Sequence, residues 1–304
     1  MQQPCRTSLQ HVSLDEPCPL FFSIALQCGA IIKSVEKYQN LLLFSCRKPT
    51  VNKAYHFWAS AKMKNVKLPL TSQFLTDLIL QRTGPFIKLG GIQALNEWFA
   101  KGDVTGLVQY LQSRNLVSEY LRMVVEECRA DATALKNCIP RESLQKIVSI
   151  GPGNGLFELF LLDEGNTTDL MLIDIERTPG HYHGFNSKGS GYASLSATKK
   201  FIEDNVDASL KIHTCNPSMQ HLPDFKFTLL VSILSMGFHY PCDEYVDFVL
   251  RNGTEGSLVV IDKRIGAPDS GFEKMAMSLL ERRSIKARKS TRVFLQRAYK
   301  DCIS

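Results

Sequence analysis

The stretch that decides the fold is Ile147–Gly155, which reads Ile-Val-Ser-Ile-Gly-Pro-Gly-Asn-Gly. An apolar segment suited to a strand runs into three alternating glycines, and the apolar run Leu156–Leu162 that follows predicts a helix. Glycines let the backbone turn tightly and let a ligand approach without obstruction by a Cβ. The N-terminus of the following helix offers free amides to a negatively charged group. The pattern therefore predicts a ligand-binding turn at the carboxyl end of a strand.

Two common nucleotide-binding loops do not fit this turn. Leu156 stands where the dinucleotide fingerprint carries its third glycine, which argues against an oxidoreductase, and no Lys-Ser or Lys-Thr follows for a P-loop. Asp174 closes the next expected strand, 19 residues beyond Gly155. A carboxylate there is placed to accept hydrogen bonds from ribose hydroxyls, with Glu176 as the less favoured substitute.

Beyond Lys146 the sequence alternates between short apolar runs and helical stretches. We expect strands at Lys146–Ile150, Leu170–Asp174, Leu210–His213, Phe227–Ile233 and Ser257–Asp262. We expect helices at Leu156–Leu162, Leu195–Asp204, Asp243–Leu250 and Gly271–Arg282, then a basic strand pair at Ile285–Lys289 and Arg292–Tyr299. This alternation predicts a doubly wound, mostly parallel α/β sheet with helices on both faces.

The first half of the chain has a different texture, with helical spacing and few strand signals. Phe74, Leu75, Leu78 and Ile79, for example, fall on one helical face. We expect residues 1–140 to form a mostly helical cap and substrate domain, and residues 141–304 to form the cofactor-binding domain. The apolar run Pro19–Ile32 is too short for a membrane span and predicts a buried helix.

The segment Lys146–Asp174 and the strands after it resemble the class I S-adenosylmethionine-dependent methyltransferases. The resemblance covers about half the chain and implies a seven-stranded Rossmann-like sheet that binds S-adenosyl-L-methionine. It implies contacts to the methionine portion from the glycine loop and to the ribose from Asp174, with Asn216 at the adenine. The cofactor-binding residues expected on this basis are Gly151, Pro152, Gly153, Asn154, Gly155, Asp174, Ile175, Asn216 and Ser232.

The substrate side of that family follows the fourth strand, here Ser232–Pro241. The Asn/Asp-Pro-Pro-aromatic motif of amino-group methyltransferases that act on nucleobases is missing. The string Gly237–Pro241 instead resembles a loosely characterised group of bacterial sugar O-methyltransferases. A hydroxyl acceptor must lose a proton, and a histidine that titrates near neutrality suits that task. His239 is therefore the first candidate for the base, with Phe238 and Tyr240 as acceptor contacts.

The long loop from Glu176 to Tyr192 supplies the other catalytic candidates, His181 and His183. Long loops in compact domains are commonly functional. A metal site built from both histidines and Asp174 is a less favoured alternative, because no fourth ligand is evident.

Composition limits the partners and the compartment. The nine cysteines form no CxxC pair, which indicates free thiols and a cytoplasmic protein. The net charge of +6 is carried by one stretch, Arg282–Lys300, which holds eight basic residues and no acidic ones. We expect a small-molecule O-methyltransferase without membrane contact. The alternatives are an RNA or protein methyltransferase that docks through the basic stretch, and a scaffold that keeps the fold without catalysis.

Overall fold

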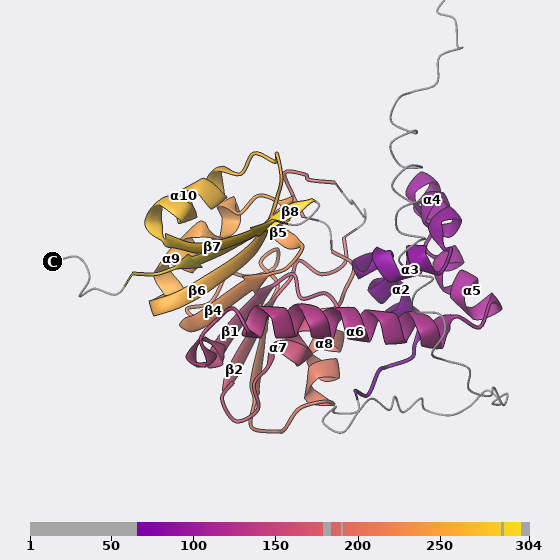
Figure 1. Cartoon of the computed structure of the whole chain (residues 1–304), viewed down its shortest axis with the longest axis horizontal. Coiled ribbons are helices and arrows are strands. Elements are labelled where there is room, and N and C mark those ends of the chain that lie inside the picture. The colour runs from indigo at the N-terminus through magenta and orange to yellow at the C-terminus, as the bar shows by residue number, and fades with distance from the viewer. Residues whose placement is uncertain (1–65, 179–183, 190, 287–288, 299–304) are drawn as a thin grey trace, which may run out of the picture. The chain divides into compact units, whose positions relative to one another are not determined.

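The computed structural model describes residues 66–178, 184–189, 191–286 and 289–298. Seven strands form one sheet in the order β3-β2-β1-β4-β6-β8-β7 (Figure 1). Their bounds are β1 Lys146–Ile150, β2 Asp169–Ile173, β3 Lys211–Cys215, β4 Phe227–Ser232, β6 Gly253–Arg264, β7 Leu280–Lys286 and β8 Ser290–Gln296. The first five pair in parallel, whereas β8 runs antiparallel to both β6 and β7. The expected mostly parallel, seven-stranded sheet is confirmed.

Both faces of the sheet are buried, as its apolar strands require. Along β2, Leu170 and Leu172 pack into one hydrophobic cluster and Met171 and Ile173 into the other. The first cluster is covered by α6 (Val117–Lys136), α7 (Leu156–Leu161) and α8 (Leu195–Glu203), and the second by α9 (Val246–Asn252) and α10 (Ser270–Ser278) (Figure 1).

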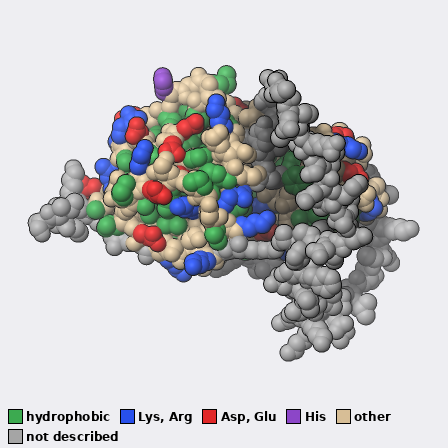
Figure 2. Space-filling view, turned by 90° about the horizontal axis from the view of Figure 1, so that it is seen from above, with side chains coloured by type: hydrophobic (Ala, Val, Ile, Leu, Met, Phe, Trp, Pro, Cys, Tyr) green, Lys and Arg blue, Asp and Glu red, His purple; other side chains and the backbone are tan. Residues whose placement is uncertain are grey.

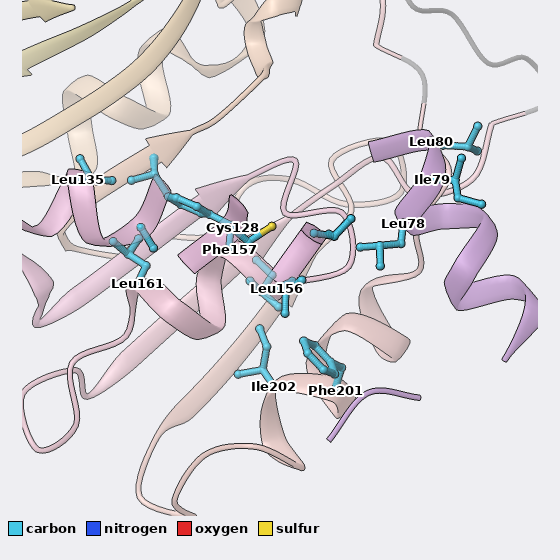
Figure 3. Close-up of a cluster of buried hydrophobic side chains, with 14 of the residues drawn as sticks. Leu78, Ile79, Leu80, Cys128, Leu135, Leu156, Phe157, Leu161, Phe201 and Ile202 are labelled. Atoms are coloured by element: carbon cyan, nitrogen blue, oxygen red, sulfur yellow. The ribbon is translucent and has the colours of Figure 1, made fainter. Parts of the chain in front are cut away.

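The described part of the first half is helical. Before α6 come α2 (Ser72–Gln81), α3 (Thr83–Lys88), α4 (Ile92–Lys101) and α5 (Thr105–Ser113). Thr71 caps α2 by accepting a hydrogen bond from the Phe74 amide at 3.1 Å. Side chains of α2 and α6, including Leu78 and Leu135, pack in the same core as Phe157 of α7 and Ile202 of α8 (Figure 3). These helices therefore share one core with the sheet, and a domain boundary at residue 140 stays a prediction.

Three sequence expectations were wrong in detail. The last helix ends at Ser278 rather than Arg282, because Leu280–Lys286 pairs with β8 as a strand. The fifth expected strand, β6, runs to Arg264, because its end pairs with the start of β8. Ser235–Tyr240, where no strand was expected, is a short strand, β5, that lies beside β6 and buries Met236 and Phe238.

Among the residues that the structure describes, no helix is long and apolar enough to cross a membrane. The run Pro19–Ile32 lies outside those residues.

Candidate functional site

The glycine loop between β1 and α7 has the backbone that its sequence requires. Gly151, Gly153 and Gly155 all adopt left-handed conformations, with φ of 71°, 57° and 79°. The Gly151 amide donates to the Ile173 carbonyl at 2.8 Å, which ties the loop to the end of β2. A Cβ at Gly151 would collide with the Ser235 side chain, and one at Gly153 would collide with Gln81. Larger residues at these positions would therefore meet both backbone strain and a steric clash.

Neighbouring helices hold the glycine loop in place. At the end of α2, the Gln81 amide donates to the Pro152 carbonyl at 3.2 Å and accepts from the Asn154 amide at 3.2 Å. On the other side, the Thr198 hydroxyl of α8 donates to the Gly153 carbonyl at 2.5 Å. Gln81 was missed from the sequence, because a polar residue at a helix end carries no motif that links it to a loop about 70 residues away.

Asp174 follows the last residue of β2 and is half-buried. Its Oδ1 accepts from the Glu176 amide at 2.8 Å. Burial raises the pKa of this carboxyl to about 6, and the nearby Glu176 carboxylate adds to the increase, while backbone amides oppose it. Further hydrogen-bond donors at this position would stabilise the ionised form of the carboxyl.

Three other residues expected at the cofactor are engaged within the protein. Glu176 accepts from the Leu195 amide at 2.9 Å and from the Asn216 side chain at 3.1 Å. The Asn216 amide oxygen, expected at an adenine, accepts instead from the Ser218 amide at 2.9 Å. Ser232 is fully buried, and its hydroxyl donates to the Ile150 and Met236 carbonyls.

One cavity of about 460 Å³ is lined both by residues expected at the cofactor and by residues expected at the acceptor. Gly151, Gly153, Asp174 and Ile175 line it from the loops after β1 and β2. Phe238, His239 and Tyr240 of β5 line the same cavity. Pro152, Asn154, Gly155, Asn216 and Ser232 do not belong to its lining. A second cavity, at the ends of β2 and β3, shares Ile175 and Tyr240 with the first, so the two cavities are adjacent.

The His239 ring is positioned by the segment after residue 183. Its Nδ1 lies 3.2 Å from the Gly184 carbonyl, and the Asn186 amide donates to the His239 carbonyl at 2.9 Å. Burial lowers the pKa of His239, the Gly184 carbonyl opposes this, and the positive charge of Arg264 lowers it further. Because Nδ1–H faces a carbonyl, the lone pair of the neutral ring lies on Nε2. The ring is therefore suited to accept a proton at neutral pH.

Tyr240 and Phe238 flank this histidine. The Tyr240 hydroxyl lies 3.2 Å from the Ser235 hydroxyl, and burial raises the pKa of the phenol, which stays protonated. Arg264 lies over the Phe238 ring, with its guanidinium carbon 4.2 Å from the ring centroid, and its Nε donates to the Phe238 carbonyl at 2.7 Å. Neither Ser235 nor Arg264 was expected, because both depend on the pairing of strands.

The other catalytic candidates, His181 and His183, lie outside the described residues, and so does the metal site that would use them.

The basic stretch Arg282–Lys300 is partly structural. Arg292 forms a bidentate ion pair with the buried Asp262, at 2.7 and 2.9 Å. Arg297 donates to the Leu250 and Gly253 carbonyls at 2.6 and 2.8 Å. Figure 2 shows Lys and Arg interspersed with Asp and Glu over the visible face, without a block of one sign.

No protein-family model matches the chain, and no curated protein sequence matches it at a significant level. Solved structures do match. An S-adenosylmethionine dependent methyltransferase from Mesorhizobium loti is 12% identical with a TM-score of 0.40, over 54% of this chain and 96% of that chain. The ribosomal protein L11 methylase from Lactobacillus delbrueckii subsp. bulgaricus is 13% identical with a TM-score of 0.38, over 58% and 79%. Similarity this distant leaves the activity to be inferred from the chain's own residues.

The class of the fold follows from the sheet itself. Five parallel strands are followed by an antiparallel pair in which the last strand, β8, inserts between β6 and β7. This is the class I methyltransferase fold, as the resemblance of Lys146–Asp174 predicted.

Proposed function

We propose that the protein transfers a methyl group from S-adenosyl-L-methionine to a hydroxyl of a small molecule. The observation that carries this proposal is the single cavity lined by Gly151, Gly153, Asp174 and His239. It joins a loop suited to a cofactor with a histidine suited to an acceptor, at the carboxyl edge of a parallel sheet, where ligands of such folds bind.

The residues present fit this cofactor. The left-handed glycines let the loop turn closely against Ser235 and Gln81 beside the cavity, and the Asp174 carboxylate can accept from ribose hydroxyls. Gly151, Gly153, Asp174 and Ile175 would hold the cofactor. When bound, S-adenosylmethionine supplies a methyl group on a sulfonium sulfur, which keeps the bonding electron pair as the acceptor oxygen takes the methyl.

The chain's own residues orient the acceptor and move its proton. Nε2 of neutral His239 accepts the hydroxyl proton, and the nearby Arg264 favours that neutral form before the acceptor binds. Tyr240, which stays protonated, orients the acceptor by donating a hydrogen bond. Buried Trp98 and Phe238 in the lining exclude water from the reacting groups.

Calorimetry with S-adenosylhomocysteine tests the cofactor site. We expect Gly153→Ala to lower the affinity at least about tenfold, since the added Cβ would collide with Gln81, which holds the loop, and overpacking of this kind costs about 1–3 kcal/mol. Gly165→Ala is the matched control, because Gly165 is also left-handed, with φ of 77°, but has open space around it. Equal affinity in both variants would contradict the assignment, and so would absence of binding to the parent protein.

The same titration carried out against pH tests Asp174. The pKa of about 6 means that the carboxylate is ionised above pH 6 and protonated below it. We expect affinity for S-adenosylhomocysteine to fall between pH 7.5 and 5, and Asp174→Asn to weaken binding and flatten that pH dependence. A steep dependence retained in the variant would assign it to another group.

A further inference from the structure

The cavity has two kinds of wall outside the glycine loop and β2. One is apolar, with Ile87 of α3, Ile92 and Phe99 of α4, and Leu234 between β4 and β5. The other is basic, with Arg264 at the end of β6 and Lys289 just before β8.

The apolar wall is unusually accessible. Phe99 is 57% exposed, Ile92 49% and Leu234 37%, although all three line one cavity. Phe99 packs on the buried Trp98, with ring centroids 4.6 Å apart, so its ring is supported from within. Large apolar side chains gathered around a concave site, rather than scattered singly, mark a surface that binds an apolar group.

The backbone of Leu234 is a second, independent indication of a ligand site. It is left-handed, with φ of 53°, a conformation that is strained for residues other than Gly or Asn. Strain of this kind is concentrated at ligand sites. At this position the chain carries a leucine that lines the cavity, where a glycine would avoid the strain.

In the basic wall, the guanidinium of Arg264 and the backbone at Lys289 are held in position. Arg264 is held by its stack on Phe238 and its bond to the Phe238 carbonyl, and the Ile265 amide donates to the Lys289 carbonyl at 3.1 Å. The third basic residue of the lining, Arg82, forms ion pairs with Glu127 and Asp131 at 3.1 and 2.9 Å. Among the described lining residues Asp174 is the only acidic one, and the cofactor proposal already uses it. The wall formed by Arg264 and Lys289 is therefore complementary to an anion.

We infer that the acceptor is an amphipathic hydroxy acid. Its apolar body, an aromatic ring system or alkyl chain, lies on Ile87, Ile92, Phe99 and Leu234, and its carboxylate faces Arg264 and Lys289. This arrangement would direct the hydroxyl toward His239 of β5, which lies beside Arg264 of β6. The inference rests on the proposed function and names its substrate class.

The test uses two probes that share an aromatic hydroxyl and differ in charge, 3-hydroxy-2-naphthoate and 2-naphthol. Binding to the full chain is measured by calorimetry, with S-adenosylhomocysteine at saturation. We expect the naphthoate to bind at least about tenfold more tightly than the naphthol, because charge-assisted hydrogen bonds are the stronger ones. Glycolate, which has the acid and hydroxyl but no apolar body, should not bind measurably.

Two variants test the contributions of the basic wall and the apolar wall to binding separately. Lys289→Gln should weaken the naphthoate about 2- to 5-fold and leave the naphthol unchanged, a loss of the size expected for an exposed charge pair. Phe99→Ser should weaken both probes to a similar extent, because each loses the same apolar contact. The controls are Lys286→Gln on β7 and Met277→Ser on α10, both exposed and outside the lining.

The outcomes distinguish the inference from the proposed function. If S-adenosylhomocysteine does not bind, the proposed function fails by itself. If it binds but the naphthoate gains nothing over the naphthol, or Lys289→Gln weakens both probes equally, the acidic class is wrong. If neither probe binds beside bound S-adenosylhomocysteine, the acceptor belongs to another class, such as RNA or protein, and the inference is overturned.

Discussion

At the scale of single residues, His239 joins a lowered pKa to a fixed ring. Burial favours the neutral imidazole, and the Gly184 carbonyl at 3.2 Å selects the tautomer whose Nε2 accepts a proton. We expect His239→Asn to lower methyl transfer about 10²- to 10⁴-fold, the usual contribution of a general base, with cofactor affinity near that of the parent. His213→Asn on β3 is the control, because His213 lies outside the cavity and faces Asp169 at 3.5 Å.

The pH profile of the parent protein gives a second measure of the same base. Because the pKa of His239 is lowered, the active neutral form persists to lower pH than for an ordinary histidine near 6.5. Turnover should therefore fall on the acid side with a midpoint below about 6.5. Arg264→Gln removes a positive neighbour, so it should move that midpoint upward. A midpoint that stays in place in this variant, or an active His239→Asn protein, would remove His239 from the proton transfer.

The candidate site residues that the sequence could indicate are those whose chemistry is local. Glycines in the order Gly-x-Gly-x-Gly and an acid at the next strand end are visible without the fold, and Gly151, Gly153 and Asp174 line one cavity. Gln81 and Arg264 were missed, because each reaches the cavity only through packing of segments far apart in the chain, whereas Ser235 lies within the expected substrate segment Ser232–Pro241 and carries no motif of its own. Asn216 follows the expected strand, but it lies outside the cavity lining and its oxygen accepts from the Ser218 amide, a detail of loop geometry that the sequence does not reveal.

At the scale of elements, the parallel strands were predicted because each is a nearly continuous apolar run. β5 was not, since Ser235–Tyr240 contains a glycine, a histidine and a tyrosine, and becomes a strand only beside β6. The turn that enters β5 contains Leu234, whose left-handed backbone is typical of Gly or Asn rather than leucine. At the comparable left-handed turn between α5 and α6 the chain does carry an asparagine, Asn115.

This contrast predicts a trade of stability against binding at Leu234. Leu234→Asn suits the left-handed backbone better, so we expect the free energy of unfolding to stay level or to rise by up to about 1 kcal/mol. The same change removes an apolar side chain from the apolar wall and should weaken the binding of 3-hydroxy-2-naphthoate at least about threefold. Chemical denaturation and calorimetry measure the two effects. A variant that is less stable and binds the probe normally would show that Leu234 serves packing alone.

At the scale of the whole molecule, the described helices before residue 140 are joined to the sheet by a common core. Cys128 and Leu135 of α6 and Leu78 of α2 pack with Phe157 and Ile202 (Figure 3). The same group of helices contributes Gln81, which holds the glycine loop, and Phe99, which belongs to the apolar wall of the cavity. The sequence indicated a helical first half but gave no sign of this shared core, because helical spacing shows which face is apolar and not what covers it.

The shared core makes a definite prediction for the isolated second half. A fragment beginning at Arg141 exposes the apolar surface of α7 and α8 that α2 and α6 cover, so we expect it to lack a cooperative thermal transition. Leu135→Ala in the full chain tests the same contact more gently. Leu135 is 1% exposed, and its truncation should cost about 2–5 kcal/mol of unfolding free energy, the range for a buried leucine. Leu280→Ala, at a leucine that is 49% exposed, should cost much less. If the fragment folded cooperatively and transferred methyl groups at the full-chain rate, the first half would be dispensable, and neither Gln81 nor Phe99 would belong to the site.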